Sequence, residues 1–166
     1  MNDDLSGAPP GSTPVFGAAV RLLAAKRLTK LQLWKKLRDR GFAPDAVRDA
    51  VDECERRRYL DDRTFAHLYV KSALERKPVG PLRLLRELIR QGVDQSTARA
   101  VLAEVDDDEE LRIERALAKL HATRPGDRYD QLARRLHSMG YGAPAIARVL
   151  RRRAREGTIG ELEDLG

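Results

Sequence analysis

The sequence is poor in aromatic residues, in cysteine and in long apolar runs. Aromatic residues make up only 5% of the 166 residues, whereas leucine, alanine and arginine are abundant, and this mix favours helix over strand. No run of about 20 apolar residues occurs, so the sequence predicts no membrane span. Cys54 is the single cysteine, which excludes an internal disulfide and fits a reducing compartment. We therefore expect a cytoplasmic protein.

The sequence also lacks the groupings on which catalysis and metal or nucleotide binding depend. His67, His121 and His137 are scattered and do not have the spacing of metal ligands. No glycine-rich loop with a lysine offers a phosphate site, and no nucleophile can be matched with a base. We expect no enzyme, with no catalytic residue, no metal and no cofactor.

Positive charge is in surplus, and the acidic ends of the chain conceal part of it. The formal net charge is +6. Residues 1–10 and 157–166 hold five acidic residues and no basic ones, so the remaining residues 11–156 carry a net charge of +11. Such a surplus favours a polyanionic partner, either nucleic acid or an acidic protein surface. The alternative is a solvated surface in which charges on exposed helix faces pair with one another.

A pattern of leucines and a glycine occurs three times along the chain. Two leucines lie eight and four residues before Gly41, Gly92 and Gly140, and an apolar residue follows each glycine. Leucines four residues apart form the buried stripe of a helix, and a glycine with positive φ can end that helix. The glycines lie 51 and 48 residues apart, a period typical of helical repeats.

The repeated pattern predicts an all-α protein of three tandem three-helix repeats. The repeats are assigned to residues 14–58, 59–105 and 106–156. Residues 1–13 are expected to form a flexible N-terminal segment, and residues 157–166 an acidic C-terminal tail. No strand pattern competes with this interpretation.

Local signals place individual helices within the repeats. Thr29 and Gln32 have the spacing of a capping box. We expect helices at about 62–77 and 81–91, the latter with proline at its first position. A further helix at about 107–122 is opened by the acidic run DDDEE at 106–110, which suits the positive end of the helix dipole.

Asp61 and Asp62 are adjacent carboxylates that could serve catalysis or begin a helix. Asp61 directly precedes an apolar run with helical spacing, so its side chain is expected to accept a hydrogen bond from the first turn. Asp62 falls in that first turn, where negative charge is favoured. Because no catalytic partner can be found for the pair, we interpret it as a helix start.

Two segments around this pair, YLDDRTFA at 59–66 and GPLRLLRELIRQGV at 80–93, resemble the RecX family of regulators of the RecA recombinase. That family combines a Tyr/Phe-Leu-Asp-Asp-x-x-Phe-Ala segment with a Gly-Pro-x-Arg-hydrophobic-x-x-Glu-Leu-x-x-x-Gly segment. The matching residues are Tyr59, Leu60, Asp61, Asp62, Phe65 and Ala66, followed by Gly80, Pro81, Arg83, Leu84, Glu87, Leu88 and Gly92. The resemblance covers residues 14–156 and is strongest in the second repeat. We expect these motif residues to be mainly structural.

The resemblance implies a shape and an activity. Proteins similar to RecX form tandem three-helix repeats in an elongated, curved arrangement. They bind the RecA–DNA filament along its groove and inhibit its recombinase and coprotease activities, which affects recombination, DNA repair and the SOS response. For this chain we accordingly expect a RecA filament as partner, contact with single- or double-stranded DNA, no membrane, and a monomer.

Two expected helices carry arginines opposite an apolar face. In helix 81–91 the basic residues are Arg83, Arg86 and Arg90, and the expected buried residues are Leu84, Leu85, Leu88 and Ile89. In the last helix the basic residues are Arg148, Arg151, Arg152 and Arg155, and the expected buried residues are Ile146, Val149 and Leu150. Arginine binds carboxylate and phosphate in a bidentate manner, so both sets are candidates for partner binding.

The alternative for the first arginine set is a solvated face with local pairs such as Arg83 with Glu87. The last helix offers only Glu156 to offset its arginines, which favours binding there. A rival function is a stand-alone DNA-binding protein acting without RecA, because three-helix units can resemble helix-turn-helix modules. An enzyme is the remaining, least supported, alternative.

Overall fold

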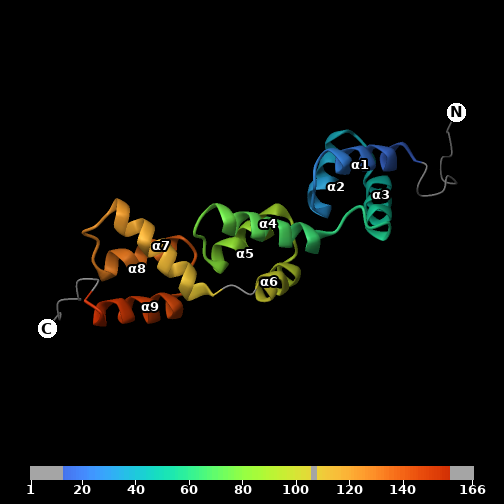
Figure 1. The fold of residues 1–166 in the computed structure, drawn as a ribbon. Helices are drawn as coiled ribbons and strands as arrows, with labels where there is room; N and C mark the ends of the chain where they lie inside the picture. Colours follow the sequence, from blue (N-terminus) through green and yellow to red (C-terminus); the bar gives the residue numbers. More distant parts are fainter. Residues whose placement is uncertain (1–12, 106–107, 158–166) are drawn as a thin grey trace, which may run out of the picture. The chain divides into compact units, whose positions relative to one another are not determined.

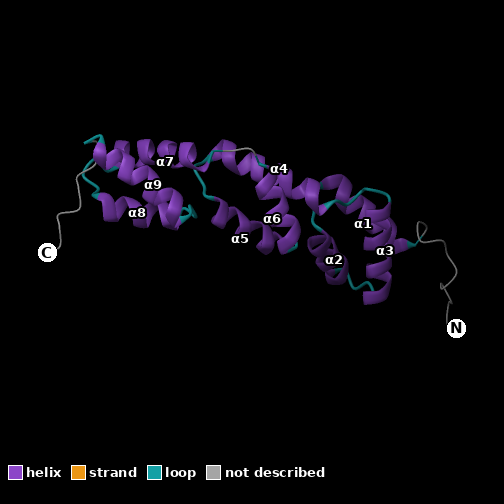
Figure 2. Ribbon diagram, turned by 90° about the horizontal axis from the view of Figure 1, so that it is seen from below, coloured by secondary structure: helices purple, strands orange, loops and turns teal. Residues whose placement is uncertain are grey.

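A computed structural model describes residues 13–105 and 108–157, and within these ranges it contains nine α-helices and no strand (Figures 1 and 2). The predicted all-α class is confirmed. The helices are α1 (Pro14–Ala25), α2 (Lys30–Asp39), α3 (Pro44–Arg56), α4 (Asp62–Arg76), α5 (Pro81–Gln91), α6 (Gln95–Glu104), α7 (Glu109–Thr123), α8 (Tyr129–Ser138) and α9 (Ala143–Arg155). None of these helices is long and apolar enough to cross a membrane.

Some expectations from the sequence fall outside the described residues. These concern the flexible N-terminal segment up to residue 12, the acidic tail from residue 158, and the first two residues of the run DDDEE. The rest of that run behaves as expected, since the Asp108 side chain accepts hydrogen bonds from the backbone N–H groups of Glu110 and Leu111 at the start of α7.

The chain divides into two compact units. Unit 1 comprises residues 1–68 and 88–98, and unit 2 comprises residues 69–87 and 99–166. The middle helices α4, α5 and α6 therefore contribute one end to each unit. The division into three repeats at residues 59 and 106 stays a prediction.

In unit 1, helices α1, α2 and α3 pack against one another around an apolar core. Phe16, Leu33 and Leu37 are buried there, together with the thiol-bearing Cys54. Thr29 forms the predicted capping box with Gln32: its hydroxyl accepts from the Gln32 N–H, and the Gln32 side chain accepts from the Thr29 N–H. The cap fixes where α2 begins.

In unit 2, helices α7, α8 and α9 pack in the same way around a second core. Its fully buried members include Ile113, Leu136, Val149 and Leu150. Tyr141 is also buried, and its hydroxyl donates a hydrogen bond to the Arg112 carbonyl at 3.4 Å. Burial of side chains of this size contributes about 1.5–3 kcal/mol each, so both cores are substantial.

The three signature glycines end helices α2, α5 and α8 as predicted. Their φ angles are +86° for Gly41, +98° for Gly92 and +91° for Gly140. In each case the following apolar residue donates its backbone N–H to a leucine carbonyl in the helix it has just left. The donor and acceptor pairs are Phe42 with Leu37 (3.4 Å), Val93 with Leu88 (3.1 Å) and Tyr141 with Leu136 (3.2 Å). This is the hydrogen-bond pattern of a Schellman cap.

In unit 1, the start of α2 meets the end of α5. The Thr29 hydroxyl donates to the Gln91 carbonyl at 2.7 Å. The start of α2 also contacts α4, since the Lys30 N–H donates to the Asp62 carboxylate at 2.9 Å. Gly92 lies so close to α2 that a Cβ there would be 2.7 Å from the Cβ of Leu31. The junction thus needs both a free carbonyl and a missing side chain at the end of α5.

In unit 2, the start of α5 meets the end of α8 in an equivalent way. The Gly80 N–H donates to the Met139 carbonyl at 2.9 Å, and the Leu82 N–H donates to the Gly140 carbonyl at 3.0 Å. A Cβ on Gly80 would be 2.1 Å from the Gly140 carbonyl carbon, and a Cβ on Gly140 would be 2.4 Å from that of Arg83. Helix α5 thus contacts α8 at its start, in unit 2, and α2 at its end, in unit 1.

Candidate partner-binding surface

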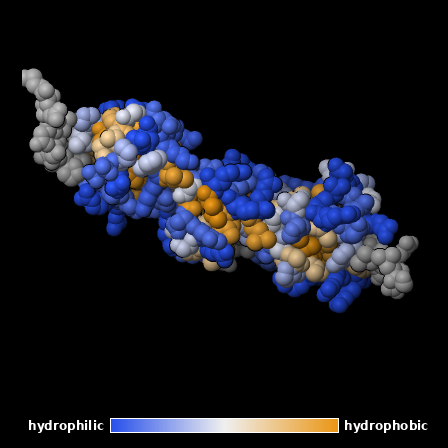
Figure 3. All heavy atoms as spheres, turned by 180° about the vertical axis from the view of Figure 1, so that it is seen from behind, coloured by the Kyte–Doolittle hydropathy of each residue, from blue (hydrophilic) through white to orange (hydrophobic). Residues whose placement is uncertain are grey.

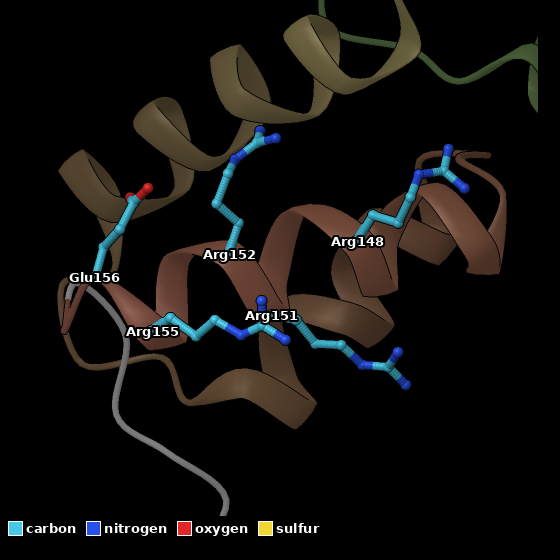
Figure 4. A pocket seen from close by; sticks show the side chains of 5 residues that line it. All are labelled: Arg148, Arg151, Arg152, Arg155 and Glu156. Carbon is cyan, nitrogen blue, oxygen red and sulfur yellow. The ribbon is translucent and has the colours of Figure 1, made fainter.

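Helix α9 presents four arginines around one open hollow of about 500 Å³ (Figure 4). The lining residues are Arg148, Arg151, Arg152, Arg155 and Glu156. We call this the α9 hollow. The apolar side of the helix is buried as predicted, with Ile146, Val149 and Leu150 in the core of unit 2. The 3.6-residue period of the helix thus gathers the arginines on one side.

Two of these arginines are held by acidic residues of α7. Arg148 donates to Glu110 at 2.6 Å, and Arg152 donates to Glu110 at 3.2 Å and to Glu114 at 2.9 Å. The neighbouring Arg153 also pairs with Glu114, at 2.6 Å. The expectation that only Glu156 offsets the positive charge is therefore wrong, because α7 packs beside α9 and supplies two more carboxylates.

These ion pairs perturb the carboxylates of α7. The hydrogen bond from Arg148, followed by that from Arg152, lowers the pKa of Glu110 below its usual value. Burial acts to raise the pKa of Glu114, but hydrogen bonds from Arg153 and Arg152 outweigh it, and the net shift is downward. Both carboxylates stay ionised near neutral pH and fix the orientation of the arginines.

Arg151 and Arg155 differ from their neighbours on α9. Both are exposed, and neither has an ion pair with any residue of the ranges that the structure describes. Figure 4 shows their side chains extending along the hollow, away from α7. The four predicted residues thus form two positioned guanidinium groups and two that are available to a partner.

The arginines of α5 are less concentrated. In unit 2, Arg83 donates to Glu87 at 2.9 Å, which is the local pair that the solvated-face alternative anticipated. Glu87 also accepts from the Tyr69 hydroxyl at 3.1 Å. Burial acts to raise the pKa of Glu87, and these two hydrogen bonds, with the Arg83 charge, lower it overall. Arg86 is exposed and donates to a backbone carbonyl of its own helix.

At the other end of α5, in unit 1, Arg90 is exposed and has no ion pair among the described residues. Leu84 and Leu88 are fully buried as predicted, but Ile89 is 43% exposed, so the expectation that it is buried is wrong. The helical period places Ile89 at the edge of the apolar face of α5, and its exposure shows that this edge is left uncovered among the described residues. Figure 3 shows such hydrophobic patches, in orange, on an otherwise hydrophilic surface.

The two adjacent aspartates have separate structural roles in unit 1. Asp61 accepts hydrogen bonds from the Thr64 N–H at 3.0 Å and from its hydroxyl at 2.8 Å, and these bonds lower the pKa of the Asp61 carboxyl. The predicted helix start is confirmed. Asp62 begins α4 but binds the N-terminus of α2 through Lys30, a contact that sequence reasoning missed. Burial raises the pKa of Asp62, and the Lys30 N–H only partly opposes this.

The remaining motif residues are mostly buried or confined by neighbours. Leu60 is buried, Phe65 is half-buried, and Pro81 is the first residue of α5. Tyr59 is different, since it is 52% exposed. Within the described part of the chain, no group of three His, Cys, Asp or Glu side chains could hold a metal ion.

The fold defines an all-helical protein assembled from small three-helix units. Comparison with known proteins extends this. Residues 16–54 match the family model for the first three-helix domain of RecX, and residues 61–102 match that for the second. A RecX regulatory protein of Halorhodospira halophila is 34% identical over 146 residues, covering 86% of this chain and 89% of that relative.

Two further comparisons agree. A RecX regulatory protein of Legionella pneumophila is 31% identical over 96 residues, covering 58% of this chain and 63% of the relative's length. The crystal structure of RecX from Lactobacillus salivarius superposes with a TM-score of 0.77 at 18% identity, covering 83% of this chain and 93% of that one. The chain belongs to the RecX family of regulatory proteins.

Proposed function

We propose that this protein is a regulator, mainly an inhibitor, of the RecA recombinase that binds the RecA–DNA filament. It would thereby modulate recombination, DNA repair and the SOS response. In this proposal it acts in the cytoplasm as a monomer and catalyses no reaction of its own. Membership of the RecX family is the observation that carries the proposal, and the arginines of the α9 hollow supply the matching chemistry.

The proposed mechanism is steric and electrostatic. Arg151 and Arg155 offer unpaired guanidinium groups that suit carboxylates of a protein filament or phosphates of the enclosed DNA. Arg83, Arg86 and Arg90 on α5 would add weaker contacts, and several weak contacts on one chain gain affinity through avidity. A protein bound across neighbouring subunits would hinder subunit addition or block the entry of a second DNA or a repressor.

The second candidate function is DNA binding without RecA, and the density of arginines on α9 favours it. It makes a different prediction, since the affinity for bare DNA would then match or exceed the affinity for the filament. A protein whose DNA contact is confined to the filament binds bare DNA weakly at physiological salt.

The test compares two double variants by co-sedimentation with cognate RecA on single-stranded DNA. We expect Arg151→Ala with Arg155→Ala to weaken filament binding about tenfold, because two charge-assisted contacts are lost. If both contacts are to phosphate, the slope of log affinity against log salt concentration should fall by about two. The control, Arg115→Ala with Lys119→Ala, removes two exposed charges from α7.

The control double variant should bind the filament like the unmodified protein. Equal affinities for all three proteins would remove the α9 hollow from the proposal. Absence of wild-type binding to the filament, or tighter binding to bare DNA, would overturn the RecA assignment itself.

A further inference from the structure

Unit 1 has a surface groove to which the proposed function assigns no role. A hollow of about 260 Å³ is lined by Val20, Leu23, Ala24 and Tyr59. It adjoins a second hollow of about 450 Å³, which shares three of these residues. The second hollow adds basic residues from the end of α1 and from the turn between α3 and α4. We call the two together the Tyr59 groove.

The backbone at the edge of this groove is strained. Arg58 has φ +58°, and the other described residues with positive φ, at +68° to +98°, are all glycines. The turn has the same hydrogen bonds as the glycine caps, since the Arg58 N–H donates to the Glu55 carbonyl and the Tyr59 N–H to the Cys54 carbonyl, both at 2.9 Å. Glycine would adopt this conformation without strain, whereas a residue with a Cβ does so at a cost. Strain of this kind indicates that the side chain is used.

The cations of the groove are available to a partner. Lys26, Arg27 and Arg58 line it, and none has an ion pair with a residue of the described ranges. Their neighbours Arg56 and Arg57 instead pair with the buried Glu53. Three positive charges are thus concentrated beside an apolar hollow.

The groove also contains one carboxylate and one exposed aromatic ring. Both carboxylate oxygens of Asp61 bind Thr64, yet the carboxylate keeps its negative charge. Tyr59 lines both hollows and remains 52% exposed, although the next residue, Leu60, is buried. An exposed aromatic ring between an apolar hollow and a cluster of cations is a typical anchor for a peptide.

We propose that the Tyr59 groove binds an acidic peptide segment of a protein partner. One bulky apolar side chain of the peptide enters the smaller hollow, and its flanking carboxylates bind Arg58, Arg27 and Lys26. The aliphatic lining of the smaller hollow favours a peptide over nucleic acid, because it accepts an apolar side chain and offers little to the polar edge of a base. This binding goes beyond the proposed regulation of RecA and can be tested without it.

The probe is a synthetic seven-residue peptide in which one leucine is flanked on each side by three acidic residues. It is titrated into the 15N-labelled full chain and followed by NMR. We expect saturable shifts of the amide signals of Ala24 and Tyr59. A peptide with alanine in place of leucine, and one with amides in place of the carboxylates, should each bind at least tenfold more weakly.

Two variants locate the binding in the protein. Arg58→Gly relieves the backbone strain while removing one cation, so it should melt at a higher temperature than the wild type and bind the peptide about tenfold more weakly. Tyr59→Ala should also weaken binding, whereas Lys35→Ala, which removes an exposed cation from α2, should leave it unchanged. A merely structural Arg58 would not reduce binding while stability rises.

Three outcomes would overturn the proposal. The first is equal peptide binding by the Arg58→Gly variant and the wild type. The second is shifts of the groove signals with a ten-nucleotide oligo(dT) but not with the peptide, which would assign the groove to nucleic acid. The third is a change of the same signals on dilution of the protein alone, which would assign it to a second copy of the chain.

Discussion

The junction between α2 and α5 and the junction between α5 and α8 use the same geometry with different chemistry. In unit 1, side chains make the contacts, since the Thr29 hydroxyl binds the Gln91 carbonyl and the Gln32 side chain binds that of Gln91. In unit 2, the bonds between Gly80 and Met139, and between Leu82 and Gly140, join backbone to backbone. The first junction is therefore sensitive to loss of a side chain, and the second to the addition of one.

The signature glycines show the same contrast. Gly41, Gly92 and Gly140 all have positive φ. A Cβ on Gly41 would meet nothing within 4 Å, whereas on the other two it would collide with the start of another helix. One sequence signal thus combines two requirements, a left-handed backbone at all three positions and close approach at two of them.

The largest expected effect is at the backbone junction of unit 2. In Gly140→Ala the added Cβ would lie 2.6 Å from the Arg83 backbone nitrogen, so the two helices must separate. Left-handed strain and overpacking together predict a loss of about 3 kcal/mol in the free energy of unfolding. Urea denaturation measures it. Gly41→Ala, at a similar positive φ but with nothing within 4 Å of the added Cβ, is the matched control, and equal losses in the two variants would contradict the close approach.

Gly92→Ala in unit 1 should be less damaging. Its nearest neighbour would be the Cβ of Leu31, at 2.7 Å, and its other two near neighbours, at 3.0 Å, are side-chain atoms, so the crowding is less severe than at Gly140. We expect a loss of about 2 kcal/mol, against about 1 kcal/mol for Gly41→Ala, which introduces only backbone strain. Thermal melts of the two variants would separate the requirements, and identical melting temperatures would show that the close approach of Gly92 to α2 adds no cost.

A further side-chain contact in unit 1 holds the start of α2, between the Asp62 carboxylate of α4 and the Lys30 N–H. Asp62→Ala leaves the Lys30 N–H without its acceptor and should lower the free energy of unfolding by about 1 kcal/mol. Asp62→Asn keeps an acceptor oxygen and should retain most of the stability. Chemical denaturation at pH 7 distinguishes the two, and equal destabilisation would imply that charge, not the hydrogen bond, is what α2 requires.

The same residue predicts a dependence on pH. Because folding raises the pKa of Asp62 above its usual 3.8, the folded state holds its proton more tightly than the unfolded state. The stability of the wild type relative to Asp62→Asn should therefore be greatest at acidic pH and decline as pH rises from about 3.8 through the higher folded pKa. Denaturation of both proteins across this window measures the difference, and a rise with pH would show that folding lowers this pKa.

An effect of the opposite sign is expected at the end of α3, where arginine occupies the position that glycine holds at the ends of α2, α5 and α8. Arg58→Gly should raise the free energy of unfolding of unit 1 by about 1 kcal/mol, since it removes left-handed strain. Thermal denaturation provides the measurement. A lower melting temperature would mean that the Arg58 side chain itself stabilises the fold.

Sequence reasoning predicted the local features well. Helix 81–91 has the predicted bounds, and the helix expected at 62–77 occurs at Asp62–Arg76. Proline at the first helical position and Asp61 as a cap act within one turn of the chain, so their effects can be predicted without knowing the fold.

Contacts between distant residues were not predicted. The pairing of Glu110 and Glu114 with Arg148 and Arg152 joins α7 to α9. A signal for it existed, because both pairs have four-residue spacing and therefore lie on one face of each helix. The helical period of a sequence shows which residues share one face of a helix, but it does not show which other helix packs against that face. The exposure of Ile89 has the same origin.

The proposed function is tested most directly by ATP hydrolysis. Cognate RecA is assembled on single-stranded DNA, this protein is added in increasing amounts, and the hydrolysis rate is followed together with the amount of sedimented filament. A filament-bound inhibitor predicts that the rate falls as the protein co-sediments, with a weaker response from the Arg151→Ala, Arg155→Ala variant. An unchanged rate with no protein in the pellet would contradict the proposal.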